Sequence, residues 1–142
     1  MKIIGFNFTK ISAEKKADPK GKIKINSNVE ITNTIKDKVE IIKDSEVYKF
    51  DFKYSINYEP KTAFIEFEGN ILSILEKEKA KEVQKSWKKK KVPDEIRIVL
   101  FNLIMTKCNI KALQLEEELG IPSHVPLPRI NPQVQQPANY TG

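Results

Sequence analysis

The chain has 142 residues, enough for one domain with its own hydrophobic core, and we expect that domain to span residues 1–130. Its 39% hydrophobic and 31% charged residues are ordinary for a folded protein, which excludes a wholly disordered chain. The formal net charge is +6, and residues 77–91, with eight lysines and two glutamates, carry all of this surplus (8 − 2 = +6). A protein that coats nucleic acid spreads basic residues over several elements, so the net charge alone does not indicate that function.

The single cysteine, Cys108, excludes an internal disulfide and suits a reducing compartment, so we expect a cytoplasmic protein. The first seven residues lack the apolar core and the cleavage site of a secretory signal. The longest apolar run, Ile96–Met105, is interrupted by Arg97 and Asn102 and is shorter than a membrane span. We therefore expect no membrane span.

Apolar residues at every second position predict antiparallel strands in the first seventy residues. The pattern is clearest over residues 48–58, and turn signals occur at residues 18–21 and 59–62. The charged segment 37–45 either extends a strand or forms a hairpin arm. The alternating residues are Ile4, Phe6, Phe8, Ile23, Ile25, Val29, Ile31, Tyr48, Phe50, Phe52, Tyr54, Ile56, Tyr58, Ile65, Phe67 and Ile71.

After Gly69 the alternation changes phase: the apolar residues occupy odd positions from Ile65 to Ile71, and then the even positions Leu72 and Ile74. A glycine beside a phase change predicts a bulge or a close approach of two backbones.

Helical spacing begins near Glu76, where Ala80, Val83 and Trp87 fall on one stripe. Pro93 and two acidic residues predict the start of a second helix, which continues at least to Lys107. Helical residues then reach Leu119, before Gly120, either without interruption or after a bend near Cys108.

The remaining residues have no helical or strand period. Residues 124–130 are expected to be extended along a surface and residues 131–142 to be disordered. Strands followed by helices predict an α+β fold, with a four-stranded antiparallel sheet and helices packed on one of its faces.

The chain offers little for catalysis. His124 and Cys108 are the only residues of their types, whereas a zinc site needs about four such ligands. Cys108 is predicted to be a buried structural cysteine, and His124, among prolines, to be exposed. Glu66 and Glu68 alternate with apolar residues, which puts them on the solvated face of a strand. We expect no enzyme activity, no cofactor and no metal.

The second helix is apolar on nearly all sides, with Ile98, Phe101 and Met105 on a different face from Ile96 and Leu100. One sheet can cover only one side of such a helix. We therefore predict a homo-oligomer through Ile98, Phe101 and Met105. The alternative is that the short helix and the tail cover this face within one chain.

In motif order the chain resembles the export chaperone SecB and its SecB-like relatives, including divergent archaeal ones. The resemblance rests on FNFTKISAE (6–14), AFIEFEGNILSI (63–74), the proline-initiated helix VPDEIRIVLFNLIMTK (92–107) and HVPLPRI (124–130), and spans about residues 4 to 130. It implies an ATP-independent holdase for unfolded or precursor polypeptides, which binds its clients in apolar grooves between sheet and helices and assembles as a dimer of dimers. The expected groove residues are Phe64, Phe67, Gly69, Leu72, Ile74 and Trp87. SecB proteins are acidic, and their acidic sheet surface is associated with docking the motor protein SecA, so this basic chain puts SecA coupling in doubt.

A cluster of lysines around Trp87, here called the basic patch, allows a different function, a nucleic-acid- or ribosome-associated module. The basic patch is Lys85, Lys88, Lys89, Lys90 and Lys91. In this function Trp87 would stack on a base while the lysines neutralise phosphates. In the chaperone interpretation, Trp87 packs inward and the lysines form a solvated connector between two helices. A third possibility is an interaction module of another kind.

Overall fold

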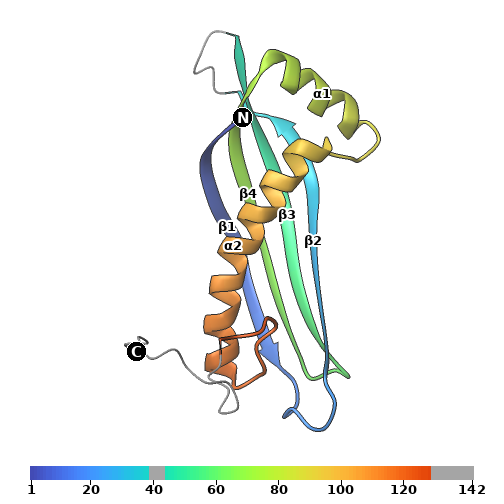
Figure 1. Cartoon of the computed structure of the whole chain (residues 1–142), viewed down its shortest axis with the longest axis vertical. Coiled ribbons are helices and arrows are strands. Elements are labelled where there is room, and N and C mark those ends of the chain that lie inside the picture. The colour runs from blue at the N-terminus through green and yellow to red at the C-terminus, as the bar shows by residue number, and fades with distance from the viewer. Residues whose placement is uncertain (39–43, 129–142) are drawn as a thin grey trace, which may run out of the picture.

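The computed structural model describes residues 1–38 and 44–128, and in these residues a four-stranded antiparallel sheet precedes two helices (Figure 1). The predicted α+β fold is confirmed. The sheet order is β1-β4-β3-β2, so β1 and β2 are the edge strands. The elements are β1 (Lys2–Lys15), β2 (Lys24–Lys36), β3 (Ser45–Glu59), β4 (Ala63–Glu76), α1 (Lys77–Trp87) and α2 (Asp94–Leu119).

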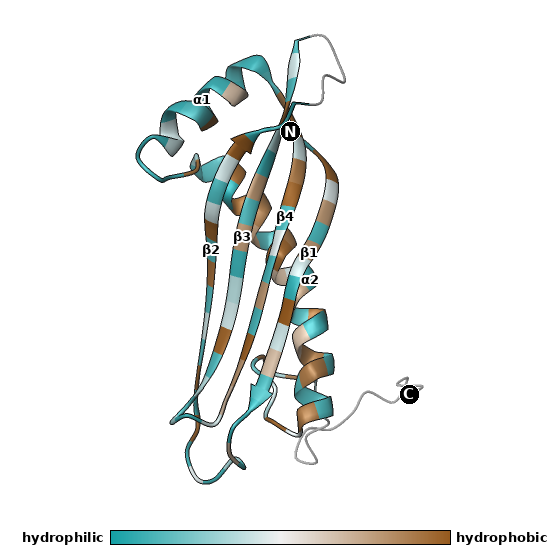
Figure 2. Ribbon diagram, turned by 180° about the vertical axis from the view of Figure 1, so that it is seen from behind, coloured by the Kyte–Doolittle hydropathy of each residue, from teal (hydrophilic) through white to brown (hydrophobic). Residues whose placement is uncertain are grey.

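The face of the sheet toward α2, here called the inner face, carries most of the core. The six alternating residues of β3 from Tyr48 to Tyr58 all point to it and are at most 4% exposed. Their partners on β4 include Ile65, Phe67 and Ile71, each fully buried. Neither of the two described helices covers the opposite, outer face, and Figure 2 shows strands banded by hydrophilic and hydrophobic residues.

The bulge predicted near Gly69 lies in the neighbouring strand, and the predicted phase change in β4 is wrong. Ile71 and Leu75 are buried on the inner face, whereas Leu72 lies between them in the strand and so points to the outer face. Strand β1 has the irregularities, between Ile3 and Gly5 and between Phe8 and Lys10. Each inserts one residue into β1 and thereby keeps its apolar residues on the inner face.

The predicted close approach at Gly69 is confirmed. A Cβ atom on this residue would overlap the carbonyl oxygen of Asn7 and lie 2.7 Å from the ring of Phe52. Gly69 therefore allows β1 and the Phe52 ring to pack against β4.

Helix α2 runs without interruption over 26 residues, so the chain does not bend near Cys108. Pro93 is its N-cap residue, and it ends at Gly120, whose φ of 64° is left-handed and favours glycine. The helix crosses the inner face diagonally, from the β2 edge toward the β1 edge (Figure 1). Its buried residues recur every fourth position: Ile96, Leu100, Ile104, Cys108, Ala112 and Glu116.

Beyond Gly120, residues 121–128, here called the strap, turn back beside the last turns of α2 without forming a helix or strand (Figure 1). Of the segment 124–130 that we predicted to lie along a surface, residues 124–128 do so in this strap. Residues 131–142, predicted to be disordered, lie outside the described residues. So do residues 39–43, within the segment 37–45 whose conformation the sequence left open.

Candidate functional site

Because one helix crosses a four-stranded sheet, the inner face is incompletely covered at its edges. Four apolar residues of β1 and four on or next to β2 are half-buried and pack against the core. We call these sets the β1 strip and the β2 strip; they flank α2 on opposite sides (Figure 1). The β1 strip is Ile3, Phe6, Phe8 and Ala13, and the β2 strip is Ile23, Ile25, Val29 and Ile31.

The β1 strip is continuous with the aromatic core beneath α2. The Phe6 ring lies 5.1 Å from Phe8 and stacks at 5.2 Å on Phe52, measured between centroids. Phe8 also lies 5.6 Å from Phe67. Such contacts hold the rings in fixed positions and leave their outer surfaces as a preformed apolar patch.

The structure does not bring the six predicted groove residues together. Phe67 and Gly69 point to the inner face, and Phe67 is fully buried under α2. Phe64, Leu72 and Ile74 occupy alternate positions of the same strand and therefore point to the outer face. The prediction combined residues of both faces because it took them from one motif of the resemblance, residues 63–74, whose neighbouring positions alternate between the faces.

Trp87 ends α1 and is half-buried against the core, as its place on the apolar stripe of the helix predicted. The ammonium group of Lys90 lies 5.2 Å from the centre of its ring. The ring thus packs against the core and has a lysine of its own chain near it, with which a stacked base would compete.

The basic patch forms an exposed turn between the two helices. Lys85 lies in the last turn of α1, and the backbone N–H groups of Lys89 and Lys91 donate to the carbonyl of Ser86, at 3.0 and 3.3 Å. All five lysine side chains are exposed: Lys85, Lys88, Lys89, Lys90 and Lys91. The patch therefore has the geometry of a solvated helix junction, as the chaperone interpretation predicted.

The predicted oligomer face of α2 is open to solvent at two of its three residues. Ile98 is 58% exposed and Met105 is 44% exposed, while Phe101 is half-buried against the core. Val99 and Ile110 add further exposed apolar surface to the same helix. Within the described residues neither α1 nor the strap covers Ile98 or Met105; the rest of the tail, which the one-chain alternative also includes, lies outside these residues.

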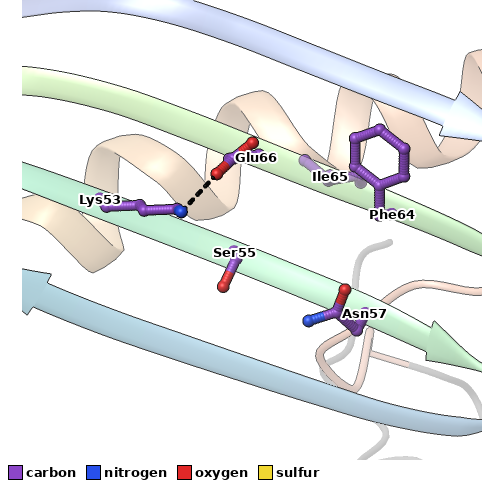
Figure 3. A pocket seen from close by; sticks show the side chains of 6 residues that line it. All are labelled: Lys53, Ser55, Asn57, Phe64, Ile65 and Glu66. Atoms are coloured by element: carbon purple, nitrogen blue, oxygen red, sulfur yellow. Dashed lines mark ion pairs between the residues drawn. The ribbon is translucent and has the colours of Figure 1, made fainter.

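The outer face of the sheet carries paired charges of both signs. Glu66 lies 3.0 Å from Lys10 and 2.8 Å from Lys53, and these two lysines lower the pKa of its carboxyl group. A shallow hollow of about 210 Å³ lies beside it (Figure 3). The residues around the hollow are Lys53, Ser55, Asn57, Phe64, Ile65 and Glu66. Glu66 and Glu68 lie on the solvated face, as predicted, and the two flanking lysines tie Glu66 into a surface ion-pair network.

A buried polar cluster, which we did not predict from the sequence, joins α2, β3 and the strap. Glu116 is 2% exposed and accepts hydrogen bonds from the hydroxyl of Tyr58 and from the backbone N–H of His124. The Nδ1 atom of His124 lies 3.0 Å from the same carboxylate, and its Nε2 atom lies 2.7 Å from Oδ1 of Asn109. Tyr54 donates to Asn109 at 2.9 Å.

The predicted exposure of His124 is therefore wrong, since its side chain is 2% exposed. Neighbouring prolines indicated an extended segment correctly, but they carry no information about the surface on which that segment lies. The sequence did contain a signal for this contact. A glutamate lies in the last turn of an apolar helix, and a histidine follows it eight residues later.

Cys108 is fully buried, as predicted. Burial raises the pKa of its thiol to about 12, and burial also raises the pKa of the Tyr54 and Tyr58 hydroxyls above their usual values.

Stability is expected to fall as the pH rises above about 9 toward 12. Each of these groups has a higher pKa in the folded state than in the unfolded state, so the unfolded state loses its protons first and is favoured at high pH. The urea midpoint should therefore decrease over this range, and it should decrease less in Cys108→Ala, which lacks the thiol. Ellman's reagent at about pH 8 should modify the native protein only after urea is added, and rapid modification without urea would contradict the burial.

By length and composition alone, α2 could cross a membrane, with a mean hydropathy of 1.3 over an 18-residue window. The run Ile96–Met105 by itself is shorter than a span, whereas an 18-residue window of the whole helix meets this criterion, which core helices can also meet. In the structure one side of α2 packs on the inner face. Among residues 1–38 and 44–128, no three His, Cys, Asp or Glu side chains are grouped so as to hold a metal ion.

Neither a protein-family model nor a curated protein matches the sequence. Among solved structures, the chain is similar to the SecB-like chaperone Rv1957 of Mycobacterium tuberculosis, in complex with a ChAD peptide from the antitoxin HigA1 (Rv1956). The TM-score is 0.53 and the sequence identity 15%, over 92% of this chain and 91% of that one. The protein described here therefore has a SecB-like fold.

Proposed function

We propose that this protein is an ATP-independent chaperone, a holdase that binds unfolded or precursor polypeptides on the β1 and β2 strips. The observation that carries the proposal is the pair of half-buried apolar strips on either side of α2. That a protein of similar fold is known in complex with a peptide supports the same kind of ligand.

The strips suit an extended polypeptide because each belongs to an edge strand. An edge strand offers unpaired backbone N–H and C=O groups, and the neighbouring apolar side chains accept many different client residues. Recognition of this kind is tolerant of sequence, as a holdase requires.

In this proposal the protein is cytoplasmic, spans no membrane and catalyses no reaction, and protein export is a role that it could serve. The mixed charges around Glu66 on the outer face differ from the acidic surface associated with SecA docking. We therefore propose that the protein acts without SecA.

The chaperone function is tested by the aggregation of chemically unfolded citrate synthase with and without the protein, at low and high salt. Val29→Lys, in the β2 strip, is expected to weaken suppression severalfold, because a charge enters the apolar surface. Asn28→Lys, one residue away on the outer side of β2, adds the same charge and should leave suppression unchanged. Both variants must retain the unfolding midpoint of the native protein.

Suppression that persists at high salt supports apolar client binding. Loss of all binding at high salt, together with salt-sensitive binding of single-stranded RNA, would instead favour a nucleic-acid function of the basic patch. The contact of Lys90 with the ring of Trp87 argues against base stacking there.

We further propose a homo-oligomer, a dimer of dimers, through Ile98, Phe101 and Met105 of α2. The double variant Ile98→Glu/Met105→Glu is expected to lower the mass in solution to that of a smaller species, since buried charges oppose association. Arg97→Glu, which changes a charge on the exposed side of the first turn, serves as the control. Light scattering that gives one monomer mass for all three proteins would refute the interface.

A further inference from the structure

The strap lies on the inner face of the sheet, the face that carries the proposed client strips. It runs over the inner face beside the lower half of α2, toward β3 (Figure 1). The hydroxyl oxygen of Tyr58 lies 2.8 Å from the carbonyl oxygen of Pro122, and the ring of His124 meets the ring of Tyr54 edge-on at 6.4 Å.

The two tyrosines connect the strap to the β2 strip. Tyr54 pairs with Val29 across β3 and β2, and Tyr58 pairs with Ile25. The strap therefore rests on the strand next to the β2 strip, on the same face of the sheet. It is an extended segment with apolar and proline residues, which are also the properties of a client chain.

Polar side-chain contacts hold the strap at three groups of the core: the hydroxyl of Tyr58, the amide of Asn109 and the carboxylate of Glu116. His124 supplies two contacts to this carboxylate, its backbone N–H at 2.8 Å and its Nδ1 atom at 3.0 Å. The Nε2 atom contacts Asn109. These contacts of His124 are here called the latch, and the buried side chain of Ile121, 6% exposed, supplies an apolar anchor three residues earlier.

A latch of this kind can open without loss of the fold. Burial of a charged group costs desolvation that its hydrogen bonds only partly offset, so the net stabilisation by such a group is small. Glu116 is in the last turn of α2, and once the strap leaves, water can hydrate its carboxylate. No strand or helix follows residue 120 within the described residues, so the strap can leave by itself.

We propose that the strap is an internal competitor, which lies beside the β2 strip in the free protein, where it obstructs an extended client, and is displaced when a client binds. The geometry also indicates the client class: an extended chain with an apolar residue that replaces Ile121 and, three positions later, a hydrogen-bond donor such as His, Lys or Arg that meets Glu116. This inference rests on the chaperone function proposed above.

The test compares the full-length native protein with His124→Ala and Glu116→Gln. Hydrogen exchange at the amide of residue 124, which donates to Glu116, reports opening of the strap, and fluorescence anisotropy reports binding of labelled, reduced and carboxymethylated α-lactalbumin. Both variants should exchange at least about tenfold faster in the strap, because a lost hydrogen bond to a charged group corresponds to a change of that order. Both should also bind the unfolded probe severalfold more tightly.

Two controls keep the result interpretable. Ser123→Ala changes the strap but leaves the latch, and should alter neither exchange nor affinity. Exchange in β3 and in the first half of α2 should stay as in the native protein, which shows that the fold is intact.

A peptide of residues 120–128, added to His124→Ala, should bind it and compete with the unfolded probe, whereas the same peptide with His124→Glu should bind at least severalfold more weakly. Faster strap exchange with unchanged probe affinity would overturn the competitor role alone. Unchanged strap exchange would refute the latch. If neither the native protein nor the variants bound the probe, the chaperone function itself would be refuted.

Discussion

Replacing Gly69 with alanine is expected to lower the free energy of unfolding by about 3 kcal/mol, at the upper end of the usual range for overpacking. The new methyl group would overlap the carbonyl oxygen of Asn7 and lie 2.7 Å from the ring of Phe52. Backbone cannot yield as a flexible side chain can, and the Phe52 ring is held against Phe6 and Phe8. Urea unfolding monitored by circular dichroism measures the change.

Gly5→Ala is the matched control, because Gly5 also lies in the β1–β4 pair. A Cβ atom there would meet only the side chain of Leu72, at 3.5 Å, which is ordinary contact. This variant should be as stable as the native protein or slightly more stable, since alanine restricts the unfolded chain. Equal destabilisation by the two substitutions would contradict the close approach at Gly69.

Phe67→Ala is expected to destabilise the protein by about 4 kcal/mol, within the range for a buried phenylalanine. Phe67 is fully buried, and its ring stacks on Tyr54 at 6.0 Å and contacts Phe8 at 5.6 Å. Its loss would leave a cavity between β4, β1 and α2 that the surrounding strands cannot fill by collapsing.

Phe64→Ala removes the same side chain three residues earlier in β4, on the outer face. Phe64 is only partly buried, and its ring is met by the ammonium group of Lys16 at 5.4 Å. We expect a loss of about 1 kcal/mol, since little apolar surface returns to water. Thermal and urea unfolding of the two variants would show whether these residues lie on different faces; similar losses would contradict that arrangement.

The two phenylalanines also bear on the proposed client surface. The sequence grouped them in one groove, whereas the strips that remain accessible belong to the edge strands β1 and β2. Phe67→Ala should reduce chaperone activity only through lost stability, and Val29→Lys should reduce it at unchanged stability. The unfolding midpoint of each variant, measured beside the aggregation assay, separates these two causes.

Much of the fold could be predicted from the sequence because the relevant signals are local. The six alternating residues of β3 specify one buried strand face, and Pro93 and Gly120 mark the two ends of α2. Trp87 and Cys108 were correctly placed against the core, because each continues an apolar helical stripe. These patterns depend only on backbone period and on capping, which neighbouring residues determine.

Other features depended on contacts between segments distant in the sequence. The bulges of β1 keep its apolar side chains on the same sheet face as those of β4, a strand far away in the sequence. Only the pairing of β1 with β4 shows that β1 carries the extra residues. The sequence determined the elements of this protein and the apolar character of α2. The tertiary structure alone decided which apolar residues stay accessible and that His124 lies buried against Glu116, because both depend on how one diagonal helix and one extended segment share a single sheet face.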